Sequence, residues 1–149
     1  LSPKIAKAVE EVRKRAGNGP VGVVTGFEST ARLLNLLLPE FKLVNTRTPG
    51  QQDHLVTNHS VILFDRELPF LTNFESVVFV DYPWSGAVID DAVGSAAVKS
   101  GTKSVTIIHM DGSLDDRIAV FAARRRDSRA SASHSAPPTV QEMRQLLRN

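Results

Sequence analysis

Short, continuously apolar runs separated by helical patterns constrain the fold of this chain most strongly. We expect these runs to form five strands, at residues 21–25, 41–44, 61–64, 77–80 and 104–108. A strand with one solvent-exposed face alternates apolar and polar residues, whereas a strand covered on both faces reads as continuously apolar. The pattern therefore predicts an α/β fold in three layers, with a parallel sheet and helices on both of its faces.

Signals for the start and end of helices lie between the expected strands. Ser2 and Pro3 form a favoured N-cap and first helical residue, and Pro39 ends a leucine-rich helix that opens at Glu28. Ser113 precedes a third helix, and we interpret it as a cap rather than a nucleophile because no partner base is in view. Weaker helical patterns end at residue 56 and cover residues 89–98.

Three regions of different composition divide the chain. Residues 1–127 hold the strand and helix patterns and are expected to form one domain. Residues 128–139, SRASASHSAPPT, are rich in Ser, Ala and Pro, which predicts a disordered linker. Residues 140–149 form a tail with a short helical segment at 140–147 that could pack on another surface.

Composition excludes several classes of protein. The chain of 149 residues has no cysteine, so disulfides and thiolate metal sites are ruled out. Its four histidines show no ligand spacing, and each is expected to be a surface or structural residue. No apolar run approaches the ~20 residues of a membrane span. We therefore expect an intracellular protein with no metal and no membrane partner; its start at Leu1 rather than Met predicts a fragment of a longer chain.

The sequence lacks the short motifs that hold nucleotides or nucleophiles. Neither GxxxxGK[ST] nor GxSxG occurs. The spacing GxGxxG occurs at residues 17–22, but it precedes an expected strand instead of joining a strand to a helix, so we expect no cofactor-binding and no catalytic residue. Two acidic pairs do occur, at residues 90–91 and 115–116. Adjacent residues on a helix point about 100° apart, which makes such pairs poor joint sites. The pair at 115–116 is explained by the dipole of the helix that starts there.

Basic residues are clustered although the formal net charge is only +2. Arg124, Arg125 and Arg126 stand at the expected end of the last domain helix, and other basic residues crowd the N-terminus. Such clusters can bind phosphates electrostatically. Cations at a helix C-terminus also stabilise the helix dipole, so both interpretations stay open.

The order of these elements resembles the C-terminal RecA-like lobe of Swi/Snf-type remodelling ATPases over about residues 2–125. The most specific block is VFVDYPWSGAV at residues 78–88, which is similar to a family run of the form VIxYDxxWNPAV. Five of its residues fall in register without a gap: Asp81, Pro83, Trp84, Ala87 and Val88. Weaker blocks are residues 21–25 with the helix that follows, residues 41–49 (similar to YxRLDGSTP) and residues 105–121 (similar to VxVYRLxxxGTxEERI).

The departures from the family pattern concern the residues that the family uses for ATP hydrolysis. The arginine motif QAxxRAxRxGQ has lost its glutamine and both arginines, whose places are taken by Asp91, Ser95 and Val98. Lys99 lies one residue from the second arginine position, and a lysine does not reproduce the planar guanidinium fork. The Gly-rich STRAGGxGxNL motif is replaced by residues 63–73, which contain no glycine. In the family, an arginine of the QAxxRAxRxGQ motif contributes on the order of a thousandfold or more to the rate of phosphoryl transfer.

The resemblance therefore implies a helicase-like lobe that binds rather than hydrolyses. A nuclear, chromatin-associated setting is implied, with another protein or a first ATPase lobe as partner and nucleic acid as a further candidate. Expected contact residues are Thr46, Arg47, Thr48, Arg66, Lys99, Lys103, Arg124, Arg125 and Arg126. Two alternatives stay open. One is a working second lobe in which Lys99, Lys103 and Arg66 supply the missing charge, and the other is an unrelated α/β enzyme domain.

Overall fold

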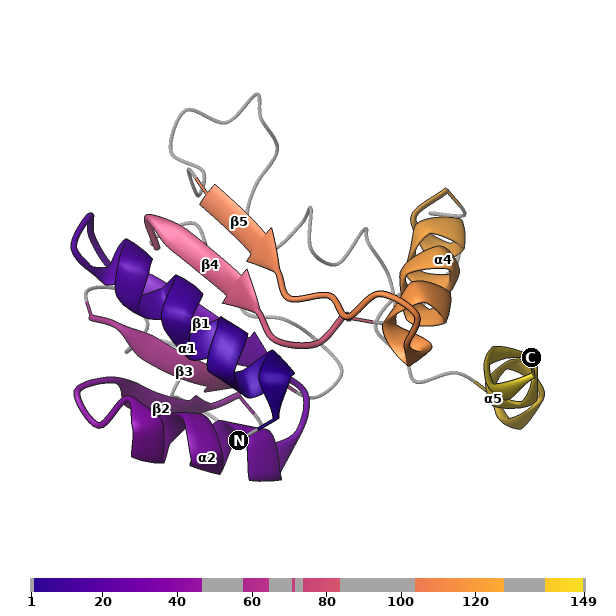
Figure 1. Cartoon of the computed structure of the whole chain (residues 1–149), viewed down its shortest axis with the longest axis horizontal. Coiled ribbons are helices and arrows are strands. Elements are labelled where there is room, and N and C mark those ends of the chain that lie inside the picture. The colour runs from indigo at the N-terminus through magenta and orange to yellow at the C-terminus, as the bar shows by residue number, and fades with distance from the viewer. Residues whose placement is uncertain are drawn as a thin grey trace.

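The computed structural model of the chain contains a five-stranded, all-parallel sheet with helices (Figure 1). It describes residues 2–46, 58–64, 71, 74–83, 104–127 and 139–148. The elements are α1 (Pro3–Ala16), β1 (Val21–Thr25), α2 (Glu28–Leu37), β2 (Lys42–Asn45), β3 (Ser60–Leu63), β4 (Ser76–Phe79), β5 (Ser104–Ile107), α4 (Leu114–Asp127) and α5 (Val140–Leu147).

The strands follow the order β2-β3-β1-β4-β5, which places β1 in the middle of the sheet. Val23 of β1 is opposite Val61 of β3 on one side and Val78 of β4 on the other. The chain leaves β1 toward β2 and returns past β1 to reach β4. The order therefore reverses between β1 and β4, and the carboxyl ends of these two strands define the switch point of the sheet.

Helices α1 and α2 cover one face of the sheet, as Figure 1 shows. Val21 and Val23 of β1 point into the cluster beneath them, and Val24 points to the opposite face. The helices contribute the buried side chains of Ile5, Ala8, Val12, Ala31 and Leu34. Their spacing of three or four residues is the one that the sequence indicated, because those positions share one side of a helix.

The opposite face of the sheet carries a second buried cluster, to which Leu71 and Phe74 contribute from the segment between β3 and β4. The ring of Phe74 lies against Gly22 of β1, where an added Cβ atom would stand 3.2 Å from two ring carbons. A larger residue would push this ring away from the sheet. Gly22 therefore serves close packing between the strand and Phe74.

Helices α4 and α5 lie beyond the carboxyl ends of β4 and β5 (Figure 1). Thr139 caps α5 in a reciprocal capping box with Glu142. Arg117 of α4 donates a hydrogen bond from Nη1 to the carbonyl oxygen of Leu146 at 2.7 Å, and the Leu146 side chain is buried. The helix predicted at 140–147 is confirmed, and it packs on α4.

The parallel α/β sheet predicted from the sequence is confirmed, and the observed strand boundaries differ from the expected ones by at most one residue. His59 has a structural role, since its Nδ1 accepts the Val21 amide hydrogen and its ring stacks on Phe41. The expected helices near residues 56 and 89–98, and linker residues 128–138, lie outside the described residues. No helix in the described part of the chain is long and apolar enough to cross a membrane.

Two leucines on α2 provide a matched test of this packing. Leu34 is fully buried, whereas Leu36 is 78% exposed. We expect Leu34→Ala to lower the free energy of unfolding by ~2–5 kcal/mol because it leaves a cavity, and Leu36→Ala to change it by less than about 0.5 kcal/mol. Urea unfolding followed by circular dichroism measures both. Equal effects of the two substitutions would contradict the placement of α2.

Candidate functional site

Polar side chains meet at the switch point, where β1 and β4 end. Thr25 is the last residue of β1, and Asp81 follows β4 by two residues. The Thr25 hydroxyl donates to Asp81 Oδ2 at 2.6 Å, and the Gly26 amide donates to Asp81 Oδ1 at 2.9 Å. Thr25 Oγ1 also accepts a hydrogen bond from the Phe27 amide. The carboxyl group of Asp81 therefore joins the ends of both strands.

Burial of Asp81 changes its acidity. Removal from water raises the pKa of its carboxyl group above the ordinary value of 3.8, because burial disfavours the charged form. The hydrogen bonds from Thr25 and Gly26 and the charge of Lys4 act in the opposite direction, and the charge of Asp115 adds to the rise. Burial is the largest cause. The hydrogen bonds to Asp81 therefore offset only part of the free-energy cost of ionising a buried carboxyl group.

An ion pair joins the start of α1 to the start of α4. Lys4 Nζ lies 2.9 Å from both carboxylate oxygens of Asp115, and the two side chains are only 21% and 11% exposed. Asp115 Oδ2 also accepts the Met110 amide hydrogen at 3.0 Å. The two partners are 111 residues apart in the sequence. This contact therefore fixes α4 relative to the helical layer of the sheet.

His109 connects the segment after β4 to α4. Its Nδ1 shares a hydrogen bond with the Tyr82 hydroxyl at 2.7 Å, and its Nε2 lies 2.5 Å from Asp116 Oδ1. Asp116 Oδ2 accepts the Gly112 amide hydrogen at 2.8 Å. The His109 hydrogen bond, followed by that of Gly112, lowers the pKa of Asp116 below 3.8. Burial, followed by the charges of Asp115 and Asp116, raises the pKa of Tyr82 above 10.0.

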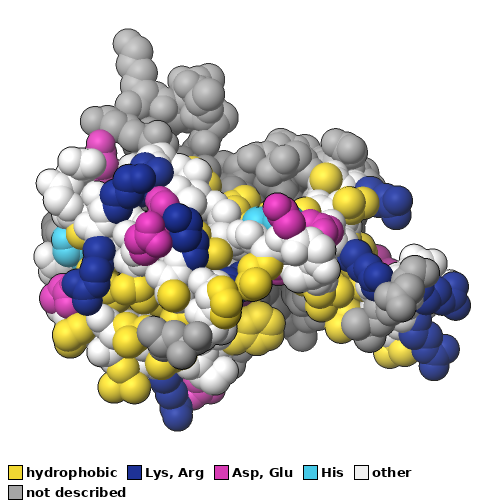
Figure 2. Space-filling view, viewed as in Figure 1, with side chains coloured by type: hydrophobic (Ala, Val, Ile, Leu, Met, Phe, Trp, Pro, Cys, Tyr) yellow, Lys and Arg dark blue, Asp and Glu magenta, His cyan; other side chains and the backbone are white. Residues whose placement is uncertain are grey.

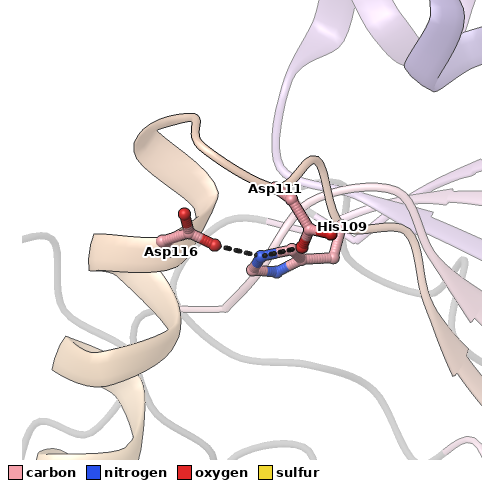
Figure 3. A group of neighbouring side chains, drawn as sticks. All are labelled: His109, Asp111 and Asp116. Carbon is pink, nitrogen blue, oxygen red and sulfur yellow. Dashed lines mark hydrogen bonds and ion pairs between the residues drawn. The ribbon is translucent and has the colours of Figure 1, made fainter.

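The loop before α4 also brings together three side chains that could hold a metal ion. Figure 3 shows the ring of His109 between the carboxylates of Asp111 and Asp116. One ligand atom from each lies within 4.8 Å of the others, and the Asp111 contact to Nε2 is 3.6 Å long. One imidazole and two carboxylates form a set that Zn²⁺ accepts. Among the described residues, His109, Asp111 and Asp116 are the group with this geometry, and no sequence pattern predicted it.

No protein-family model and no curated protein matches the chain. Solved structures do match. The C-terminal part of the Fun30 ATPase domain has a TM-score of 0.59 and 14% identity, over 79% of this chain and 45% of that one. The C-terminal domain of the Sulfolobus solfataricus SWI2/SNF2 ATPase has a TM-score of 0.60 and 14% identity, over 97% of this chain and 68% of that one.

The fold is that of a C-terminal RecA-like lobe of Swi2/Snf2-type ATPases. The Sulfolobus solfataricus SWI2/SNF2 ATPase core in complex with dsDNA matches with a TM-score of 0.59 and 14% identity, over 89% of this chain and 32% of that one. The chain thus spans less than half of the Fun30 structure and about a third of that core. At this identity the likeness establishes the fold alone, and it confirms the resemblance drawn from the sequence.

Two of the contact residues expected from the sequence are fully described, and they follow opposite edge strands of the sheet. Thr46 follows the outer strand β2 and donates from both its amide and its hydroxyl to the Leu63 carbonyl oxygen. Arg124 is exposed on α4, which follows β5, the edge strand opposite β2. Arg125 and Arg126 belong to α4, but their side chains are not described. The remaining expected contact and motif positions lie outside the described residues: Arg47, Thr48, Arg66, Lys99, Lys103, Asp91, Ser95 and Val98.

Sequence reasoning found some residues of this edge and missed others. Asp81 stood out because it was in register with the Snf2-type pattern, but its partners Thr25 and Gly26 were not identified. The acidic pair before α4 was assigned to the helix dipole alone. The structure confirms that Ser113 caps α4, since its Oγ accepts the Asp115 amide hydrogen. It adds that the adjacent carboxylates have separate partners, as their angular separation on a helix requires.

Replacement of Asp81 by asparagine tests its raised pKa. The native carboxyl binds its proton more tightly than the unfolded chain does, so its contribution to stability falls as pH rises from 3.8 through the raised pKa. We expect Asp81→Asn to gain stability relative to the native protein over that window. Asp116→Asn should show the opposite sign at lower pH, because the pKa of Asp116 is lowered. Urea unfolding midpoints across a pH series measure both, and a pH-independent difference for Asp81→Asn would contradict burial.

Replacement of Lys4 by methionine tests the ion pair with Asp115. The change leaves a nearly buried carboxylate without its cation, so we expect a loss of ~1–3 kcal/mol in the free energy of unfolding. Lys7→Met is the matched control, because Lys7 is on the same helix, is 54% exposed and, among the described residues, pairs with Glu10 and Glu11 of α1. The control should cost less than about 0.5 kcal/mol. Equal losses in thermal or urea unfolding would show that the pair does not anchor α4.

Proposed function

We propose that this lobe works by binding and does not hydrolyse ATP, as an interaction scaffold within a chromatin-associated factor. The supporting observation is the closed carboxyl edge between β1 and β4. Open α/β sheets bind their ligands outside the carboxyl ends of the strands at the switch point. In this lobe the Thr25 hydroxyl and the Gly26 amide already donate to Asp81. A nucleotide phosphate at this edge would have to displace a carboxyl group from both donors.

The sequence at the arginine motif supports the same proposal. Phosphoryl transfer needs positive charge on the transferred group, and a positioned arginine supplies much of the rate. Asp91, Ser95 and Val98 stand at the motif positions, and none of them can carry positive charge. Lys99 is the nearest cation in the sequence to those positions. The lobe would therefore contribute its shape and surface to a larger protein rather than a catalytic group.

The distribution of charge supports an interaction role. Residues 117–148 hold seven of the eighteen basic residues and two of the sixteen acidic residues, so this segment has a formal charge of +5 and the rest of the chain −3. Figure 2 shows basic side chains gathered over α4 and α5, next to hydrophobic ones. The Sulfolobus ATPase core was solved with dsDNA, which supports nucleic acid as one class of partner. A first ATPase lobe or another nuclear protein is the other class.

An ATPase assay on the natural protein that contains this chain tests the proposal. We expect Lys99→Ala to leave the rate of phosphate release unchanged, with and without duplex DNA, because the lobe contributes no catalytic cation. Lys14→Ala, an exposed lysine on α1, is the matched control. A loss of about tenfold or more with Lys99→Ala, and none with Lys14→Ala, would overturn the proposal. That result would identify a working second lobe.

A further inference from the structure

Helices α4 and α5 enclose a groove of about 320 Å³ on the side of the lobe away from α1 and α2. Its apolar lining comes from Val120, Phe121 and Leu146. Its polar lining consists of Asp116, Arg117, Arg124, Glu142 and Gln145. Both helices therefore contribute to one depression with a partly apolar and partly charged lining.

The apolar surface extends from the groove over both helices. Val120 is 52% exposed on α4, and Val140 and Met143 are 72% and 39% exposed on α5. Val140, Met143 and Leu146 follow one side of α5 at a spacing of three residues, and only Leu146 is buried. An isolated exposed apolar residue is ordinary, but a strip on two packed helices indicates a surface that a partner covers.

Three of the four charged side chains in the groove lining already have hydrogen-bond partners, and among them Arg117 donates to the Leu146 carbonyl oxygen. Asp116 is engaged by His109 and the Gly112 amide, and Glu142 by the Thr139 amide of the capping box. Arg124 is exposed and has no ion-pair partner among the described residues. Arg124 is therefore the charged side chain of the lining that remains available to a ligand among the described residues, and residues 117–148 carry a formal charge of +5.

We propose that the α4–α5 groove binds an acidic amphipathic helix of a partner protein. This inference rests on the proposed scaffold function and names the chemistry of its partner. A helix that binds in a groove inserts apolar side chains at positions i, i+3, i+4 and i+7, and its other side chains face solvent or the charged residues of the groove. Acidic residues there complement Arg124. Nucleic acid fits less well, because its phosphates would contact arginine side chains but would leave the apolar part of the lining uncovered.

The probe is a fluorescent helical peptide of about 18 residues, or about five turns, with Leu at the i, i+3, i+4, i+7 positions and Glu at most others. A peptide of the same composition with scrambled leucine positions is its control. Fluorescence anisotropy with the 149-residue chain measures binding at low and moderate salt. We expect the ordered peptide to bind about tenfold or more tightly than the scrambled one, and its affinity to fall with salt.

Three variants locate the binding site. Val120→Glu should weaken binding of the ordered peptide about tenfold or more, because it places a charge in the apolar part of the groove lining. Leu36→Glu is the matched control, since it adds the same charge at an exposed apolar residue of α2 and should leave affinity unchanged. Arg124→Glu should weaken binding and reduce its dependence on salt. Circular dichroism of each variant establishes that it is folded.

Two results would overturn the inference. One is equal affinity for the ordered and scrambled peptides, or no binding of either. The other is duplex DNA binding that Arg124→Glu weakens and Val120→Glu does not, together with no effect of Val120→Glu on the peptide, which would make the surface a nucleic-acid contact. Either result removes the groove assignment and leaves the scaffold proposal to its own test. Loss of ATP hydrolysis with Lys99→Ala overturns the scaffold proposal whatever the peptide does.

Discussion

The central position of β1 is the constraint on which the rest of the structure depends. Its five residues are buried, and it pairs in parallel with β3 on one side and β4 on the other. A parallel neighbour on each side requires long connections over the sheet, so helices and loops must cover the faces. The alternation of Val23 and Val24 then feeds two separate clusters. Loss of this strand would separate β3 from β4 and divide the core.

The same strand order creates the switch point and brings the polar groups together there. Thr25 and Asp81 are 56 residues apart in the sequence, yet they follow adjacent strands at one edge. In this lobe the groups satisfy one another. Such an arrangement favours rigidity over exchange with a ligand, because a buried donor that loses its partner is costly. In many α/β proteins this edge binds the ligand, whereas among the described residues of this chain its polar groups hold the ends of β1 and β4 together.

Two contacts hold α4 and α5 in place. The Lys4–Asp115 pair and the His109 bridge fix the start of α4 relative to α1 and to the segment after β4. Two apolar side chains of α4, Leu114 and Val120, stay exposed at the surface. The groove with α5 is a consequence of that geometry. The closed edge and the groove therefore support the same interpretation, in which the lobe acts by binding a partner on its surface.

The sequence by itself determined the parallel sheet, the limits of α1, α2 and α5, and the likeness to a Snf2-type lobe. These features are local, since apolar runs, caps such as Ser2 and breakers such as Pro39 act within a few residues. Only the tertiary structure decided the strand order, the Lys4–Asp115 and Asp81–Thr25 contacts, the convergence of His109 with Asp111 and Asp116, and the packing of α5 on α4. The Lys4–Asp115 and Asp81–Thr25 contacts depend on which strands become neighbours, and no local pattern in one sequence records that pairing.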